Sequence, residues 1–429
     1  MKRSDDVFEG VWWVPGKEDK RYFGTLTLNN SFELRLIDGE QSIETLFSGK
    51  GVESDIILGQ SLGKSITLLG CMNTSVQSST AGIARHHKVH VTTALIGGHL
   101  KSEQKAKFDI IEFRLSNMNA WCARSLITHT FSKAEHSLQY VSPEILSTKI
   151  PGGRIELTNH FITDPSDDTK ITWDSKDTFK ITLSKSLDLS EIGYKYLGPL
   201  RQLLTLSSGT HTSVTYLRVA NSKALDHGKR PIWFTVHNYR GRSPTREPKK
   251  LRPYEMRFTL RHEKIDFENI IPKWIRLQKK LKPPLDLLFS LNSPDGAYSW
   301  NSLFTVATAT EGMHRRLYPR SPTRTTFRSR LTELLESTAP LLNDFVGDDS
   351  KWTLMIKEYR NDVAHSLGAS TITADELLRL TQTTQLLLHI ILLRKLGFTK
   401  KQCKEIISKD AEWSYLRRVM PKTFPDLFV

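Results

Sequence analysis

Near the C-terminus, the six residues from Arg360 to His365 read Arg-Asn-Asp-Val-Ala-His and combine a permanent cation, an amide and an imidazole. An arginine binds phosphate oxygens through its planar fork, and an imidazole exchanges protons near neutral pH. Together they indicate phosphodiester chemistry, which needs charge stabilisation and proton transfer. Spacing alone does not establish this, because the same separation recurs at Arg85/His90, Arg124/His129 and Arg257/His262.

A predicted helix distinguishes Arg360 and His365 from the other three pairs. At about 100° per residue, one apolar stripe contains Trp352, Met355, Ile356, Tyr359 and Val363. Asn361 and His365 share the opposite face within roughly 40°, and Arg360 lies at the border between the two faces. Gly368 predicts the helix end, so His365 falls in the last turn, where the helix dipole favours imidazolium. The other pairs lie in or beside strand-like segments or lack such a face.

A solvent-exposed helix without a catalytic role would show the same pattern. The charge distribution along the chain is needed to choose between the two interpretations. The formal net charge is +15; residues 240–282 hold fourteen Lys/Arg against five acids, and residues 315–330 hold six arginines and no acid. Basic clusters are the electrostatic footprint of a polyphosphate partner, although they also occur as solvated faces. Because both segments flank the region of the Arg/His helix, we favour nucleic acid. The candidate RNA-binding residues are Arg315, Arg316, Arg320, Arg324, Arg328 and Arg330.

Length and composition place the chain among globular proteins. Its 429 residues are enough for two or three domains, and 38% hydrophobic with 25% charged residues is ordinary. Cys71, Cys122 and Cys403 are too dispersed for a disulfide framework or a cysteine zinc site. No apolar signal region precedes the folded-looking sequence, and the longest apolar run, 386–393, is too short to cross a bilayer. We expect a cytoplasmic protein with no membrane partner.

Periodicity predicts an α+β fold with two regions, a β-rich region at 1–264 and a helical region at 265–429. Short alternating runs in the first region predict an antiparallel sandwich or barrel, with one helix at about 190–206. A basic, proline-marked loop is expected at 243–253, and its Ser-Pro-Thr-Arg tetrapeptide recurs at 321–324. The predicted strands are 24–28, 32–37, 65–69, 89–95, 108–115, 154–157, 179–183, 214–219, 232–236 and 256–260.

From about Asp266 the apolar period changes to 3.6, which predicts helices. Thr373 with Glu376 and Thr399 with Gln402 have capping-box spacing, and Gly397 separates the last two helices. The run 386–393 is apolar all round, so its helix is central in a bundle or buried against another subunit. The predicted helices are 269–281, 300–317, 326–336, 341–346, 351–367, 374–396 and 400–408.

Other candidate sites have less support in the sequence. His86, His87 and His90 would suit zinc on a helix, but 89–95 has a strand pattern, which keeps His86 and His90 far apart. Trp12 and Trp13 could stack on a ligand, yet such residues more often belong to the hydrophobic core of a β-sandwich. Phosphate loops and nucleophile elbows have no match in the sequence. Glu311, before Arg315 and Arg316 on one helix, is an acid whose role stays open.

Two parts of the chain resemble ApeA-like proteins of bacterial anti-phage defence. Arg360, Asn361 and His365, in a late helical region, resemble the Arg-x4-6-His motif of HEPN ribonucleases. Residues 10–15 (Gly-Val-Trp-Trp-Val-Pro), 24–28 (Gly-Thr-Leu-Thr-Leu) and 200–206 (Leu-Arg-Gln-Leu-Leu-Thr-Leu) are similar to the ApeA-type N-terminal domain. The resemblance covers both halves of the chain in the expected order, which makes it more specific than either motif.

The resemblance implies a metal-independent endoribonuclease without a cofactor, acting in abortive infection on host or phage RNA, with tRNA one candidate substrate. HEPN domains generally dimerise so that two motifs build one composite site, and higher oligomers are an alternative. Arg360, Asn361 and His365 would be the catalytic residues. Attack by the ribose 2′-hydroxyl would give a 2′,3′-cyclic phosphate and a 5′-hydroxyl. The N-terminal region would sense a phage-derived trigger.

Two alternatives stay open. The first is a non-catalytic RNA- or protein-binding module with a degenerate HEPN motif. The second is a carbohydrate- or protein-binding β-sandwich with an appended dimerisation bundle, whose binding would not depend on salt, whereas contacts with RNA phosphates weaken steeply as salt rises.

Overall fold

The first six strands close into a barrel. The structure is a computed structural model that describes residues 7–28, 32–38, 56–78, 85–100, 102, 106–132, 136–167, 170–237, 249–261, 266–292, 300–319, 326–366 and 372–429. The β6 strand hydrogen-bonds to both β3 and β5, and this double pairing completes the ring of strands. Trp12, Leu26 and Leu34 fill its interior. The strands are β1 (Val7–Trp13), β2 (Tyr22–Thr27), β3 (Glu33–Asp38), β4 (Ile56–Ser61), β5 (Lys64–Ser78) and β6 (Arg85–Ile96).

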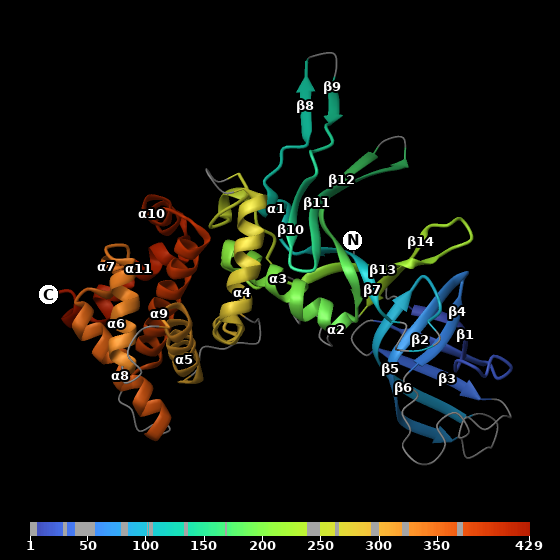
Figure 1. The fold of residues 1–429 in the computed structure, drawn as a ribbon, viewed down its shortest axis with the longest axis horizontal. Helices are drawn as coiled ribbons and strands as arrows, with labels where there is room; N and C mark the ends of the chain where they lie inside the picture. Colours follow the sequence, from blue (N-terminus) through green and yellow to red (C-terminus); the bar gives the residue numbers. More distant parts are fainter. Residues whose placement is uncertain are drawn as a thin grey trace.

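The sheet continues from β6 into a second, open part. Its outer strands follow the order β10-β11-β12-β7-β13-β14, and β14 pairs with β6. Trp121 and Phe179 contact one another on the face that packs against the short helices. The hairpin of β8 and β9 projects from this part (Figure 1). The strands are β7 (Phe108–Leu115), β8 (Ile127–Phe131), β9 (His136–Tyr140), β10 (Leu146–Ile150), β11 (Gly153–Asp167), β12 (Lys170–Leu187), β13 (Val214–Leu225) and β14 (Pro231–His237).

Three short helices belong to this β-rich part. They are α1 (Met118–Cys122), α2 (Leu189–Ile192) and α3 (Gly198–Ser208), and a π-helical turn at Gly193–Leu197 joins the last two. The single helix predicted at 190–206 is therefore confirmed as one continuous helical segment with a π turn inside it.

Eight further helices of the described chain form the C-terminal bundle. The α9 helix is its centre, since Leu386, Leu388 and Ile390 are all fully buried within one chain. Both predicted capping boxes are present, at Thr373 and Thr399. The helices are α4 (Phe267–Ser290), α5 (Trp300–Leu317), α6 (Phe327–Thr338), α7 (Asn343–Val346), α8 (Asp349–Ser366), α9 (Ala374–Leu396), α10 (Lys400–Lys409) and α11 (Ala411–Thr423).

The helix α4 connects the two parts of the molecule (Figure 1). The indole nitrogen of Trp274 donates to the carbonyl oxygen of Pro199 at the start of α3, over 2.6 Å. On its other side α4 packs against α5. As a result one apolar core runs without interruption from Leu95 to Leu427, while the barrel has a core of its own.

The α+β prediction is confirmed, and so are the other nine predicted strands, but the strand predicted at 256–260 is wrong. Met256 and Phe258 are buried there, yet the backbone crosses the ends of two helices instead of pairing with a strand. The amide of Arg257 donates to the carbonyl of Ser207, and that of Leu260 donates to the carbonyl of Trp121. Met256 and Phe258 are therefore buried alternately because the segment packs against these helix ends, and not because it is a strand.

Other differences concern the lengths of elements. The first helix of the bundle was predicted to end at 281, but α4 continues through Pro283 and Pro284. The helices α1 and α11 and the strands β1, β4, β8, β9 and β10 were not predicted. Residues 243–248 of the proline-marked loop, the tetrapeptide 321–324 and Gly368 lie outside the described residues. None of the described helices has the length and apolar character needed to cross a membrane.

Candidate active site in the helical region

The helix α8 presents the Arg/His motif because its apolar stripe is buried on the other side. Trp352 and Ile356 are fully buried, and Met355 and Tyr359 pack against the core. The indole nitrogen of Trp352 donates to the hydroxyl of Thr383 on α9, over 3.3 Å. The predicted stripe is thereby confirmed for these four residues; the side chain of Val363 lies outside the described part of the chain.

Arg360 lies at the border between the buried and the exposed face, as predicted, and its side chain is 26% exposed. Its Nη2 atom donates to Oε2 of Glu311 on α5, over 3.3 Å. Its guanidinium carbon lies 4.7 Å from the ring centroid of Phe327 at the start of α6. Among the described residues, its buried Nε atom has no hydrogen-bond partner. Three helices therefore position this guanidinium, and its side chain stays partly exposed.

Glu311 links Arg360 to a second arginine. Its Oε1 atom accepts a hydrogen bond of 2.7 Å from Nη2 of Arg315, one turn further along α5. Burial alone would raise the pKa of Glu311, but the hydrogen bond from Arg315 and the charges of Arg315, Arg360 and Arg330 outweigh burial and lower this pKa. The carboxylate is therefore ionised at neutral pH, and the role left open for Glu311 becomes that of an anionic partner of Arg360.

Asn361 and His365 follow on the same helix. Asn361 is half-buried and Asp362 is exposed. His365 lies in the last turn of α8, which ends at Ser366, and its side chain lies outside the described part of the chain. In an ideal α-helix, Arg360 and His365 are separated by about 7.5 Å along the helix axis. The backbone thus brings Arg360, Asn361 and His365 to the C-terminal end of one helix.

The six arginines of the predicted RNA-binding segment differ in what they contact. Arg315 is exposed beside Glu311, Arg316 donates to the carbonyl of Gly312, and Arg328 donates to Ser350. Arg330 is only 4% exposed, so the structure removes it from the surface that an RNA could touch. It lies on the buried side of α6, between Ser329 and Leu331, where its charge contributes to the field around Glu311. Arg320 and Arg324 lie outside the described residues.

The other candidates belong to the β-rich part. His86, His87 and His90 lie on β6, which confirms the strand interpretation. Within the described ranges, no three His, Cys, Asp or Glu side chains are grouped as metal ligands. Trp12 and Trp13 are buried, as expected for core residues.

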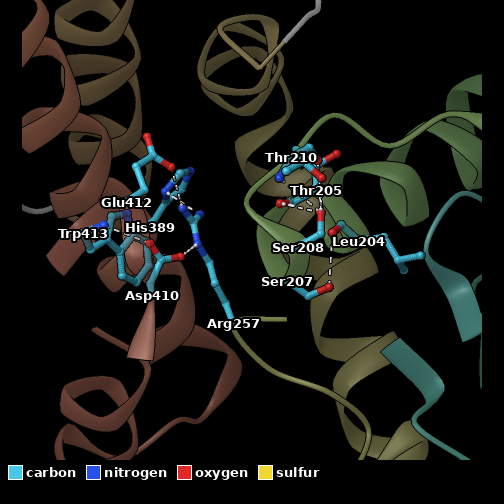
Figure 2. A network of polar contacts seen from close by, with 10 residues as sticks. All are labelled: Leu204, Thr205, Ser207, Ser208, Thr210, Arg257, His389, Asp410, Glu412 and Trp413. Atoms are coloured by element: carbon cyan, nitrogen blue, oxygen red, sulfur yellow. Dashed lines mark hydrogen bonds and ion pairs between the residues drawn. The ribbon is translucent and has the colours of Figure 1, made fainter. Parts of the chain in front are cut away.

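Sequence reasoning missed two features. Phe327 gave no signal because an aromatic residue at the start of a helix is usually only a core residue. Arg257 was set aside as one of the repeated Arg/His spacings, yet its side chain is buried and makes ion pairs with Asp410 and Glu412 (Figure 2). No spacing rule could have found these pairs, because the partners are about 150 residues apart in the chain.

Two family models match the chain. The model of ApeA N-terminal domain 1 matches residues 7–274, and the model of the Apea-like HEPN domain matches residues 304–402, which include Glu311, Phe327 and the motif on α8. No curated protein and no solved structure matches. HEPN domains are generally nuclease domains that commonly dimerise and bind RNA. With more than half of its length matched by the first model alone, the chain belongs to the ApeA family of HEPN-type defence proteins.

Proposed function

We propose that the protein is a metal-independent endoribonuclease that cleaves host or phage RNA during abortive infection, in the cytoplasm. Its catalytic residues are Arg360, Asn361 and His365. We further propose a division at 264/265 into a sensing region and a nuclease region, with a phage-derived trigger acting on the first. A transfer RNA is one candidate substrate.

The proposed reaction needs two chains. One imidazole cannot readily be base and acid at the same moment, so two HEPN domains related by a two-fold axis supply two His365 side chains. One takes the proton from a ribose 2′-hydroxyl, and the other protonates the leaving 5′-oxygen. The two Arg360 side chains stabilise the charge on the phosphorane-like transition state. Asn361 orients the imidazole or holds the phosphate, and the products carry a 2′,3′-cyclic phosphate and a 5′-hydroxyl.

The position of Arg360 is the observation that supports this reaction most directly. Its guanidinium is held over Phe327 and by one ion pair of 3.3 Å to Glu311, and its Nε atom has no partner among the described residues. Its side chain is 26% exposed, so part of the guanidinium is accessible. A pre-positioned, accessible guanidinium is what a transferring phosphate requires.

We propose that RNA follows the arginines near this site that are exposed or half-buried. Arg315, Arg316 and Arg328 carry that role among the described residues, together with Arg320 and Arg324 beyond them. Each phosphate contact that is lost on mutation reduces the salt dependence of binding by about one unit in the log–log slope.

The experiment compares purified wild type, Arg360→Ala, His365→Ala and the control His129→Ala on RNA, with EDTA present throughout. His129 is exposed and belongs to an Arg/His pair of the same spacing outside the bundle. We expect His365→Ala to reduce cleavage at least about 100-fold without weakening RNA binding, and His129→Ala to retain activity. The new ends should be 5′-hydroxyls.

The same variants are then compared in cells by mapping RNA 5′ ends with and without phage. New 5′-hydroxyl ends in wild type alone would support the nuclease and identify its substrate. Unchanged phage protection by Arg360→Ala and His365→Ala, without RNA cleavage by wild type, would contradict it and favour the non-catalytic RNA- or protein-binding module.

A further inference from the structure

The outer face of α4 carries a row of exposed cations. Lys273, Arg276 and Lys280 lie within about 60° of one another around an ideal helix, and all three are exposed. We call these three residues the basic stripe. The opposite face of α4 is apolar, and its Trp274 is fully buried. Between 269 and 285 the helix has no acid and five cations, which are Lys273, Arg276, Lys279, Lys280 and Lys282.

The charges of the basic stripe are not compensated by the described part of the protein. In those ranges none of the three side chains forms an ion pair, whereas their neighbour Lys282 pairs with Asp286 over 3.3 Å. Arg276 is three residues from Lys273 and four from Lys280, and like charges at these spacings destabilise a helix. A helix face that is merely solvated usually mixes both signs of charge. The stripe therefore lowers the stability of α4, and an anionic partner would offset this loss.

The stripe borders the neighbouring helix α5. Pro284 of α4 faces Gly312 of α5, because a Cβ at Gly312 would lie 3.4 Å from the Cβ atom of Pro284. Around the axis of an ideal helix, Lys273 is about 20° and Lys280 about 40° from Pro284. The stripe thus runs along the edge of α4 that is next to α5, and a ligand that lies on one of these helices reaches the other.

The C-terminal turn of α5 leads from the stripe to the candidate active site. The Nη1 atom of Arg316 donates to the carbonyl oxygen of Gly312, the residue that faces α4, over 3.0 Å. Arg315, the preceding residue, contacts Glu311, which is the partner of Arg360. Cations on adjacent helices therefore connect the Arg/His helix with α4.

We propose that the basic stripe of α4 binds the phosphate backbone of RNA and so extends the substrate surface beyond the candidate active site. RNA is the polyanion because the adjacent site would cleave it, and in that respect the assignment rests on the proposed function. From Lys273 to Lys280 the stripe measures about 10 Å along the helix axis, which matches about three phosphates of one strand. Backbone contacts carry no sequence information, so the stripe contributes affinity and orientation rather than specificity.

An anionic membrane is the other extended surface of negative charge that a basic helix can meet. A helix that binds there inserts its apolar face between the lipids. The apolar face of α4 packs instead into the continuous core, where Trp274 donates to the carbonyl of Pro199 and Leu281 is fully buried. The exposed face of α4 therefore offers charge without apolar surface, which suits a phosphate backbone in solution.

Binding is measured by fluorescence anisotropy with a fluorescein-labelled RNA, on full chains that carry His365→Ala so that the RNA is not cut. The stripe variant combines Arg276→Gln and Lys280→Gln. The control variant combines Lys185→Gln and Lys223→Gln, which replace two exposed lysines on β12 and β13 and change the net charge equally. Vesicles of phosphatidylserine and phosphatidylcholine in equal amounts are the lipid probe.

We expect the slope of log K against log salt to become shallower by about 1.4 in the stripe variant, at about 0.7 for each lost phosphate contact. With equal binding at about 1 M salt, this corresponds to about 25-fold weaker binding at about 0.1 M salt. The control variant should stay within about twofold of its parent, because charges beyond the Debye length are screened. The stripe variant should melt at or slightly above the temperature of its parent, because repulsion along α4 is relieved, so unfolding does not explain the loss.

RNA affinity and salt dependence that are equal in the stripe variant and its parent would overturn the proposal. Equal losses in the stripe and control variants would overturn it too, and so would vesicle binding that depends on the stripe while RNA binding does not. Cleavage is assayed separately with His365 restored. RNA binding that depends on the stripe, without cleavage, would contradict the proposed nuclease alone, whereas cleavage without such dependence would contradict the role of the stripe alone.

Discussion

Among the described residues Arg360 has a single ion pair, and the length of this ion pair allows another acceptor to replace Glu311. The 3.3 Å contact to Glu311 is longer than a strong charge-assisted hydrogen bond, and Glu311 makes its shorter contact, 2.7 Å, with Arg315. A phosphate oxygen can therefore replace Glu311 as the acceptor for Arg360, while Arg315 keeps the carboxylate ionised. Glu311 therefore positions Arg360, and in the proposed reaction it does not compete strongly with the phosphate.

Substitution Glu311→Gln tests this positioning role. The amide retains the shape of the side chain but loses the charge, so Arg360 is held less firmly over Phe327. If the protein cleaves RNA as proposed, we expect kcat to fall about tenfold with KM changed less than about twofold, because an interaction of the transition state is weakened. Glu336→Gln, an exposed carboxylate on α6, is the control. An increase in kcat would instead mean that Glu311 restrains Arg360.

The same carboxylate predicts a pH dependence of stability. Because the pKa of Glu311 is lowered in the folded protein, its ionised form stabilises the fold above the ordinary glutamate pKa. That contribution is lost as the pH falls below about 4 and through the lowered folded-state pKa. The difference in free energy of unfolding between wild type and Glu311→Gln, measured by denaturant titration, should thus be present at pH 7 and shrink toward pH 3. A difference independent of pH would contradict this.

At the scale of elements, glycines show which strand and helix positions are closely packed. Gly59 on β4 lies opposite Trp12 on the neighbouring strand β1, and a Cβ at Gly59 would clash with the indole ring. Gly312 on α5 has room for a Cβ, which would be in ordinary van der Waals contact with Pro284 at 3.4 Å. We expect Gly59→Ala to destabilise the barrel by about 1–3 kcal/mol and Gly312→Ala to stabilise its helix by up to about 1 kcal/mol. Thermal unfolding measures both, and equal effects would contradict the packing.

The sequence predicted elements wherever local chemistry decides them. The helices α5 and α9 have the predicted bounds, because α9 has a capping box and Gly397 ends it with φ +109°. The strand β7 was predicted equally well from its alternation. The segment 256–260 failed because its backbone partners, Ser207 and Trp121, are distant in sequence. The candidate site shows the same limit. Arg360 was recognisable from its residue type and helix face, whereas its contacts with Phe327 and Glu311 depend on how the helices pack.

At the scale of the whole molecule, a composite site predicts how mixed dimers behave. If each active site needs a His365 from both chains, a dimer of one wild-type and one His365→Ala chain should be at least about 100-fold less active than wild type. Random exchange of equal amounts would then leave about a quarter of the activity, against about half for independent sites. Isolating the mixed dimer with two affinity tags measures this directly, and a mixture with His129→Ala chains should keep full activity.

The continuity of the core between sheet and bundle determines which parts of the chain unfold together. The apolar cluster that begins at Leu95 extends across the boundary between the two family matches. The barrel around Trp12 and Leu26 has a cluster of its own. Cooperative units of unfolding follow buried clusters. Amide exchange should therefore show the barrel opening as one unit and the remaining sheet with the bundle as another. The barrel is then the piece that recombination could replace with a different module while the rest of the protein stays folded.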